Sequence, residues 1–366
     1  MTGLATTLKR VWDDAPKDSL ATLGLKIIAA ATALYALASL ALPFGWDQGI
    51  IALVGSAYIH GGLPYVDGWD MKGPVAYIPY AIGELLFGRT MWGARLIDLL
   101  IWAGASFILY DGVRKLTTWR IGAGAALITY LWIASAGWFF SAAPEPWVAA
   151  TCIAAIVPML SPGASLKPWI VAASGALIAC AGLVKPFYFG FGVAPLLSLV
   201  LAQDLSWWTR AKLAVFLALG ALTPPLLVGG YYALHGGLAQ AIEVHLLFPL
   251  STYTSTPTSL GSIIFGVKAV VITPPILLGL PFALLAFWAN RSAPRVVAVV
   301  AVWLVMALIC VALQAKYYTY HWFPAYPAFF ILAAMGVYAA TRVPVFRFLP
   351  PGGGVASLIV LVCCAL

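Results

Sequence analysis

Long apolar runs separated by short polar connections constrain this chain more than any other feature. Of its 366 residues, 63% are hydrophobic and only 9% are charged. A membrane span needs about 20 mostly apolar residues. Because backbone groups in lipid must be hydrogen-bonded within the protein, such runs form helices. They lack the alternation of membrane β-strands. We therefore expect one all-α integral membrane domain over residues 1–366, built from about eleven spans.

The expected spans lie near residues 22–43, 92–113, 121–140, 146–160, 169–184, 187–202, 212–234, 260–288, 296–313, 322–340 and 354–366. No small-residue cleavage site follows the first run, so we expect a signal anchor there.

The basic residues predict the orientation of these spans. Cytoplasmic loops are enriched in Lys and Arg. With the N-terminus in the cytoplasm, 14 of the 20 basic residues fall on the cytoplasmic side. The net charge of +8 therefore reflects topology, and its spread over many short loops argues against nucleic acid as a partner. We expect a multi-pass inner (plasma) membrane protein.

The other, extracytoplasmic side collects six acids and all four histidines. Charge near the hydrocarbon is costly and usually functional, so we look for chemistry on this side. Its largest segment, residues 44–91, is predicted to contain two short interfacial helices. The first follows from the spacing of Ile50, Leu53, Val54, Ala57 and Tyr58, and the second from the apolar run 75–87.

Candidate residues in this first segment each have a structural alternative. Asp47 begins the first short helix, either as an N-cap or as a general base at a substrate hydroxyl or amine. Asp67 and Asp70 form a turn or face a substrate. Lys72 either makes a surface pair with Asp70 or holds a phosphate as a point charge.

Later candidates lie where other runs begin or end on the same side. Glu145 either favours a helix dipole or acts on substrate, and Lys185 either snorkels to the interface or meets a phosphate. The densest cluster, residues 314–322, is either an aromatic belt or a clamp for a phosphate and a sugar. It contains Lys316, Tyr318, Tyr320 and His321.

Motifs for soluble nucleotide or nucleophile chemistry are absent from the sequence. There is no phosphate-binding glycine-rich loop and no nucleophile elbow. Histidines and carboxylates on the outer side could ligate a divalent metal, but no His-x-x-x-His spacing supports one. We expect no required cofactor, and a donor that is already in the membrane.

The order of motifs resembles the GT-C glycosyltransferases, in the branch of the aminoarabinose and protein O-mannosyl transferases. The resemblance rests on Asp47, the segment 62–74, Leu86-Phe87-Gly88, Ala94-Arg95-Leu96, Lys185 and the segment 316–327. The motifs cover about fifty residues, and similar hydropathy covers nearly the whole chain.

This resemblance implies transfer of a sugar from a polyprenyl-phosphate carrier to a lipid, glycan or protein acceptor outside the cytoplasm. It places Asp47 at the acceptor, Glu145 as the second acid and Lys72 at the donor phosphate. Lys185 and Lys316 would add positive charge there. The substrate pocket would contain Tyr65, Asp67, Asp70, Tyr318, Tyr320 and His321. The sequence departs from the family in Lys72-Gly73-Pro74, where Lys-Pro-Pro is common, and in the prolines beside Glu145. A further expected departure is that no large outer C-terminal domain is present.

Two other functions remain open at this point. A lipid or solute transporter also buries charge, but usually at mid-membrane on several helices, whereas here only Asp98 is deep in an expected span. A membrane scaffold would tolerate substitution of Asp47 or Lys72.

Overall fold

The computed structural model describes residues 20–253, 258–289 and 293–342, and this part of the chain is helical with no strand. Its α-helices are α2 (Leu20–Ala38), α3 (Trp46–His60), α4 (Ile78–Phe87), α5 (Met91–Leu116), α6 (Trp119–Ser135), α7 (Pro144–Ile156), α8 (Pro168–Gly182), α9 (Val193–Val200), α10 (Trp207–Leu234), α11 (Leu238–Ile242), α12 (Leu260–Val271), α13 (Pro274–Ala289), α14 (Pro294–Gln314) and α15 (Tyr326–Ala340). Short 3-10 or π segments include η1 (Ser39–Ala41), η2 (Pro74–Tyr77), η3 (Val157–Leu160), η4 (Gly163–Ser165), η5 (Pro186–Gly192), η6 (Glu243–Leu247), η7 (Pro249–Tyr253) and η8 (Thr319–Ala325).

Five of the described helices are long and apolar enough to cross a membrane, which confirms the all-α membrane class. The pair α12 and α13, bent by 73° at its break, makes a sixth if it counts as one span. The expected count of eleven is not confirmed. The runs near 146–160, 169–184 and 187–202 form shorter apolar helices, Pro144–Leu160, Pro168–Gly182 and Pro186–Val200, each of which begins at a proline. The run 354–366 lies outside the described residues.

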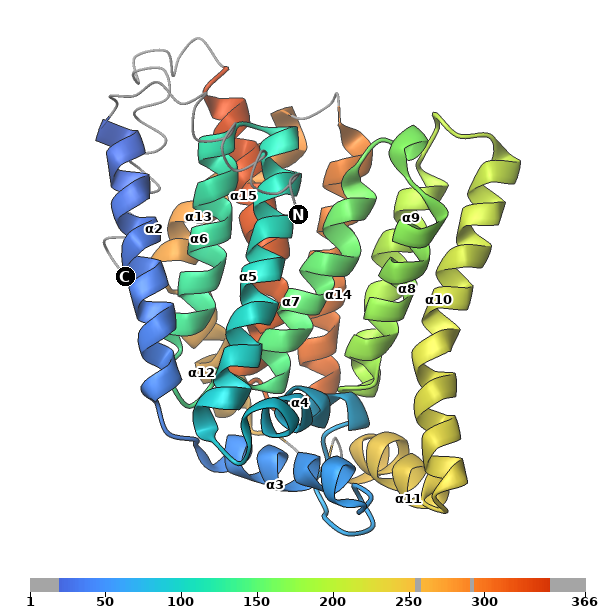
Figure 1. The fold of residues 1–366 in the computed structure, drawn as a ribbon. Coiled ribbons are helices and arrows are strands. Elements are labelled where there is room, and N and C mark those ends of the chain that lie inside the picture. Colours follow the sequence, from blue (N-terminus) through green and yellow to red (C-terminus); the bar gives the residue numbers. More distant parts are fainter. Residues whose placement is uncertain (1–19, 254–257, 290–292, 343–366) are drawn as a thin grey trace.

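The bundle has two distinct ends. Figure 1 shows α3, α4 and α11 lying across one end of the upright helices, at the bottom of the picture. This end is called the lower end. Because successive helices alternate in direction, the starts of α5 and α7 and the ends of α8, α10 and α14 meet there. This end therefore receives Asp47, Lys72, Glu145 and Lys185 together.

Helix α3 begins differently from the sequence expectation. Its N-cap is the extended residue Gly45, whose N–H donates to the side chain of Gln48. Asp47 lies in the first turn instead of at the cap. The side chain of Gln48 thus bonds the N-cap residue of α3, so the Asp47 carboxylate is not used as the cap and can meet other partners.

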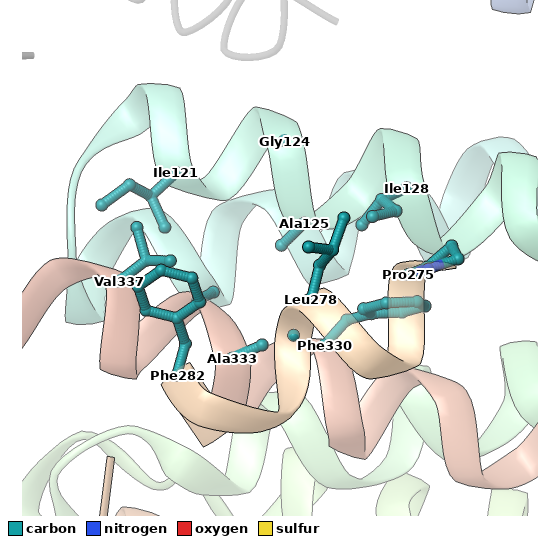
Figure 2. Close-up of a pocket in the computed structure, with 12 residues that line it drawn as sticks. Ile121, Gly124, Ala125, Ile128, Pro275, Leu278, Phe282, Phe330, Ala333 and Val337 are labelled. Carbon is teal, nitrogen blue, oxygen red and sulfur yellow. The ribbon is translucent and has the colours of Figure 1, made fainter. Parts of the chain in front are cut away.

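A small cavity of about 60 Å³ lies among α6, α13 and α15. Figure 2 shows its lining of apolar side chains, among them Ile121 and Ile128 of α6, Phe282 of α13 and Val337 of α15. A cavity this small and apolar is a packing gap between helices. It carries none of the candidate residues.

Helices α13 and α15 touch through a glycine. A methyl group added at Gly336 would meet the carbonyl oxygen of Phe282, a backbone atom that cannot rotate away. Such small-residue contacts let membrane helices approach closely.

We therefore expect Gly336→Ala to lower the free energy of unfolding by about 1–3 kcal/mol, the usual range for overpacking. Gly230→Ala in α10 is the matched control, because nothing lies within 4 Å of its added methyl group. That control should be neutral or slightly stabilising, since Ala favours helix. Thermal unfolding in detergent compares the two, and equal stability of both variants would contradict the close contact.

Candidate active site

The buried ammonium of Lys72 lies between two carboxylates at the lower end. Its Nζ is 3.4 Å from Oδ1 of Asp70 and 3.8 Å from Oδ1 of Asp47. The Asp70 side chain is only 8% exposed, whereas that of Asp47 is 47% exposed. Burial raises the pKa of Asp70, and the neighbouring Lys72 opposes this. Asp47 is therefore the carboxylate that a substrate can reach.

Two tyrosines fix the backbone that carries Lys72. The hydroxyls of Tyr65 and Tyr77 both lie 2.7 Å from the Lys72 carbonyl oxygen, to which they donate. Tyr65 itself has a left-handed backbone, with φ of 73°. Burial raises the pKa of both phenols well above the usual value, so they stay protonated donors. The turn is thus held rigid beneath the ammonium group.

A second buried lysine organises the neighbouring helix ends. Lys185 Nζ lies 2.5 Å from Oε1 of Glu145, donates to Oε1 of Gln314 at 3.0 Å, and is 3.5 Å from Nε2 of His321. The Glu145 side chain is 4% exposed. Glu145 lies at the start of α7, and Lys185 directly precedes η5. Gln314 ends α14, and His321 lies in η8. The structure therefore brings one predicted acid, Glu145, and one predicted lysine, Lys185, together in an ion pair.

One backbone hydrogen bond joins the two lysine clusters. The N–H of Gly73, next to Lys72, donates to the carbonyl of Val184, next to Lys185, at 2.9 Å. A methyl group at position 73 would meet the Leu183 carbonyl, so only glycine allows this approach. The departure from Lys-Pro-Pro at this position thus has a structural reason, because proline has no N–H to donate.

Aromatic side chains lie beside the Lys185 cluster. The ring of Phe140 lies 5.4 Å from that of Tyr320, and Lys185 Nζ lies 5.8 Å from the centre of the Tyr320 ring. The Tyr318 ring lies 5.5 Å from that of Tyr320 at an interplanar angle of 31°, and Tyr318 is half exposed. A row of rings beside an ammonium group offers a surface for the apolar face of a sugar.

Other predicted site residues are placed less directly. Asp67 accepts a hydrogen bond from the Leu63 N–H at 2.6 Å and thereby closes its turn. Lys316 is half-buried in the turn after α14, between Ala315 and Tyr317, both with φ of 54°. The substrate roles of these residues, and of the residues in both clusters, stay predictions.

Sequence reasoning missed several polar residues at this end. Gln314 and Gln48 are fully buried and hydrogen-bonded in the structure, but neither had been assigned a role. Asp98 is not isolated at mid-membrane, because its Oδ1 accepts from Nε1 of Trp147 at 2.7 Å. A buried amide has no signature in a single sequence, so only the fold reveals it.

No group of three or more His, Cys, Asp or Glu side chains within the described ranges is arranged to hold a metal ion. Lys72 and Lys185 bring positive charge next to the carboxylates at this end. Ammonium groups of this kind can hold a phosphate as point charges.

His245 of η6 is buried beside Gly73, where the hydrogen bond between Gly73 and Val184 joins the two lysine clusters. Its Cε1 lies 2.5 Å from where a methyl group on Gly73 would be, and the Gly182 backbone lies beside its ring. Neither ring nitrogen makes a hydrogen bond of normal geometry. Burial lowers the pKa of His245 to about 4, so the ring is neutral at pH 7.

This lowered pKa predicts an acid-sensitive fold. In the unfolded chain His245 takes up a proton near pH 6.5, whereas the folded protein resists it until about pH 4. Its contribution is therefore complete above pH 6.5 and is lost as the pH falls towards 4, by up to about 3 kcal/mol. Urea titration at pH 7 and pH 4.5 should show a smaller loss for His245→Gln than for the unaltered protein. His235→Gln, which changes an exposed histidine, is the control and should behave like the unaltered protein.

No protein-family model matches this chain, and no curated protein matches it either. Solved structures do match. ArnT from Cupriavidus metallidurans in the apo state aligns over 89% of this chain and 61% of its own, with a TM-score of 0.66 and 18% identity. The same protein bound to undecaprenyl phosphate aligns over 87% of this chain and 60% of its own, with a TM-score of 0.64 and 17% identity.

The archaeal oligosaccharyltransferase AglB from Archaeoglobus fulgidus, in complex with an inhibitory peptide and a dolichol-phosphate, aligns over 92% of this chain and 54% of its own. Its TM-score is 0.52 at 13% identity. This chain therefore spans about three fifths or less of the length of these proteins. Identities this low show the fold alone, and this chain therefore shares the helical membrane fold of ArnT and AglB.

Proposed function

We propose that this protein is a membrane glycosyltransferase that moves a sugar from a polyprenyl-phosphate carrier to a lipid, glycan or protein acceptor. The observation that carries the proposal is the pair of buried lysine clusters joined by the Gly73–Val184 hydrogen bond. Two buried ammonium groups at one end of an apolar bundle suit an anionic, membrane-embedded substrate.

The roles follow from exposure and charge. Asp47 is the exposed carboxylate, so it would accept a proton from the acceptor or orient it as the sugar leaves its phosphate. Lys72 and Lys185 would offset the charge of the phosphate leaving group, with Lys316 near the end of α14. Glu145 would hold Lys185 in place through their 2.5 Å contact. Tyr318, Tyr320 and His321 would line the sugar pocket. The lysines supply the charge that this proposal needs, so it assigns no role to a metal ion or cofactor.

Two of the structural neighbours support the choice of donor. ArnT was solved with undecaprenyl phosphate, and AglB with a dolichol-phosphate and a peptide. A polyprenyl phosphate is therefore the first donor carrier to test here. Because this chain spans only part of those proteins, the acceptor is proposed only as a class.

Asp47→Asn and Lys72→Met should separate acceptor activation from donor binding. Asp47→Asn keeps the side-chain shape but removes the base, so we expect turnover to fall by about a hundredfold or more with little change in donor KM. Lys72→Met removes an ammonium group from the phosphate and should raise donor KM, while acceptor KM moves little. Steady-state transfer of a radiolabelled sugar from its polyprenyl phosphate, in detergent, measures both.

Asp111→Asn at the opposite end of α5 is the control, because Asp111 pairs only with nearby Arg114 and Lys115 in the described contacts. It should transfer normally. Normal turnover of Asp47→Asn would disprove its role. Donor binding without any transfer, together with movement of the lipid across vesicles, would instead favour a transporter.

The proposal also places the lower end outside the cytoplasm. Gln240 in α11 and Gln203 between α9 and α10 are exposed at opposite ends of the bundle (Figure 1). In a cysteine-free background, Gln240→Cys should react with a membrane-impermeant thiol reagent in intact cells, whereas Gln203→Cys should react only after lysis. The reverse pattern would invert the topology and move the site to the cytoplasmic side.

A further inference from the structure

Arg95 is a buried cation that neither lysine cluster uses. It lies in the first turns of α5 and is 1% exposed. Its guanidinium donates from Nε to the Leu42 carbonyl at 2.8 Å, from Nη2 to the Pro43 carbonyl at 2.6 Å, and from Nη1 to Oγ of Ser141 at 2.6 Å. All three acceptors are uncharged oxygens. The charge of the Asp98 carboxylate, three residues on in α5, also favours the guanidinium, but Asp98 accepts none of these three hydrogen bonds. The three bonds therefore tie Arg95 to neighbouring segments of the chain.

The acceptors belong to two separate chain segments. Leu42 and Pro43 lie between η1 and α3, whereas Ser141 lies between α6 and α7. The planar guanidinium presents its donors in a rigid fork, so one side chain fixes both segments at once. Lysine, with a single ammonium on a flexible stem, cannot reproduce that geometry.

The register of these anchors relates them to the proposed site. Asp47 lies four residues after Pro43, and Glu145 lies four residues after Ser141. Each acid is in the first turn of the helix that follows its anchor. Fixing the two anchors therefore fixes where α3 and α7 begin, and with them the two carboxylates.

Two further side chains join the same segments. Gln48 accepts from the Gly45 N–H and donates to the carbonyls of Trp138, at 3.1 Å, and Ser141. Asp98, three residues after Arg95 and on the same helix, accepts from Trp147 of α7. The start of α5 is thus bonded to both helix entrances.

We propose that Arg95 is a positioning residue that holds the carboxylates of Asp47 and Glu145 in one fixed arrangement. The catalytic meaning of those acids rests on the proposed function. The coupling itself means that Arg95 holds residues 42–48 and residues 138–146 together. It does not depend on the proposed function, and it can be measured without any assay of transfer.

Hydrogen–deuterium exchange of Arg95→Lys tests the coupling directly. Amides in residues 42–48 and 138–146 should both exchange at least tenfold faster than in the unaltered protein, while amides of α14 and α15 stay unchanged. Arg89→Lys is the matched control, since Arg89 lies six residues earlier and its side chain is 73% exposed. It should alter neither segment. Loosening of only one segment, or of neither, would overturn the coupling.

Kinetics then test what the coupling does. Arg95→Lys should lower kcat at least tenfold and leave donor KM within about twofold, because Lys72 keeps Asp70 and Lys185 keeps Gln314 and His321, which lie outside the two loosened segments. An unchanged kcat in a protein whose two segments have both loosened would overturn the positioning role. If no transfer is detected even with the unaltered protein, the proposed function fails, and the exchange result still decides the coupling.

The unaltered protein provides a check should Arg95→Lys fail to fold. Because one side chain holds both segments, their amides should open together, with the same dependence of exchange on low concentrations of urea. Different dependences for residues 42–48 and 138–146 would overturn the inference.

Discussion

An ammonium group withdrawn from water must be paired, and two such groups organise the lower end of this protein. Lys72 lies between Asp47 and Asp70, and Lys185 contacts Glu145 with Gln314 and His321 beside it. Removing one partner of such a pair leaves an uncompensated buried charge, which is strongly destabilising. These pairs therefore tie together helix ends that lie far apart in the sequence, and the Gly73–Val184 hydrogen bond joins one pair to the other.

The acids at the lower end differ in burial, and this difference suggests different roles for them. Asp70 and Glu145 are enclosed with their lysines, whereas Asp47 keeps about half of its side chain exposed. An enclosed carboxylate sets the position of its cation, and an exposed one can meet a substrate. Arg95 takes part in neither cluster. It donates hydrogen bonds to the chain just before α3 and just before α7, the helices that carry Asp47 and Glu145. In the proposed chemistry, the positions of Asp47 and Glu145 thus depend on the hydrogen bonds from Arg95 to uncharged oxygens of Pro43 and Ser141.

Hydropathy predicted the membrane class because it is a local property that any single run of residues displays. The count of eleven spans is not confirmed, since apolar composition alone does not reveal how long the helix in each run is. The runs from 146 to 202 are apolar enough to be spans, yet they form short helices that begin at Pro144, Pro168 and Pro186. The break between α12 and α13, with its 73° bend, is likewise a matter of geometry.

The sequence by itself determined the helical membrane class, the gathering of charge at one end, and the candidates Asp47, Lys72, Glu145 and Lys185. Only the tertiary structure decided which of these groups pair, that Gln48 and not Asp47 serves the start of α3, and that Gln314 and Arg95 belong to the same end. The physical reason is range. Helix formation and hydropathy depend on neighbours within a few residues, whereas an ion pair such as Lys185 with Glu145 depends on how whole helices pack.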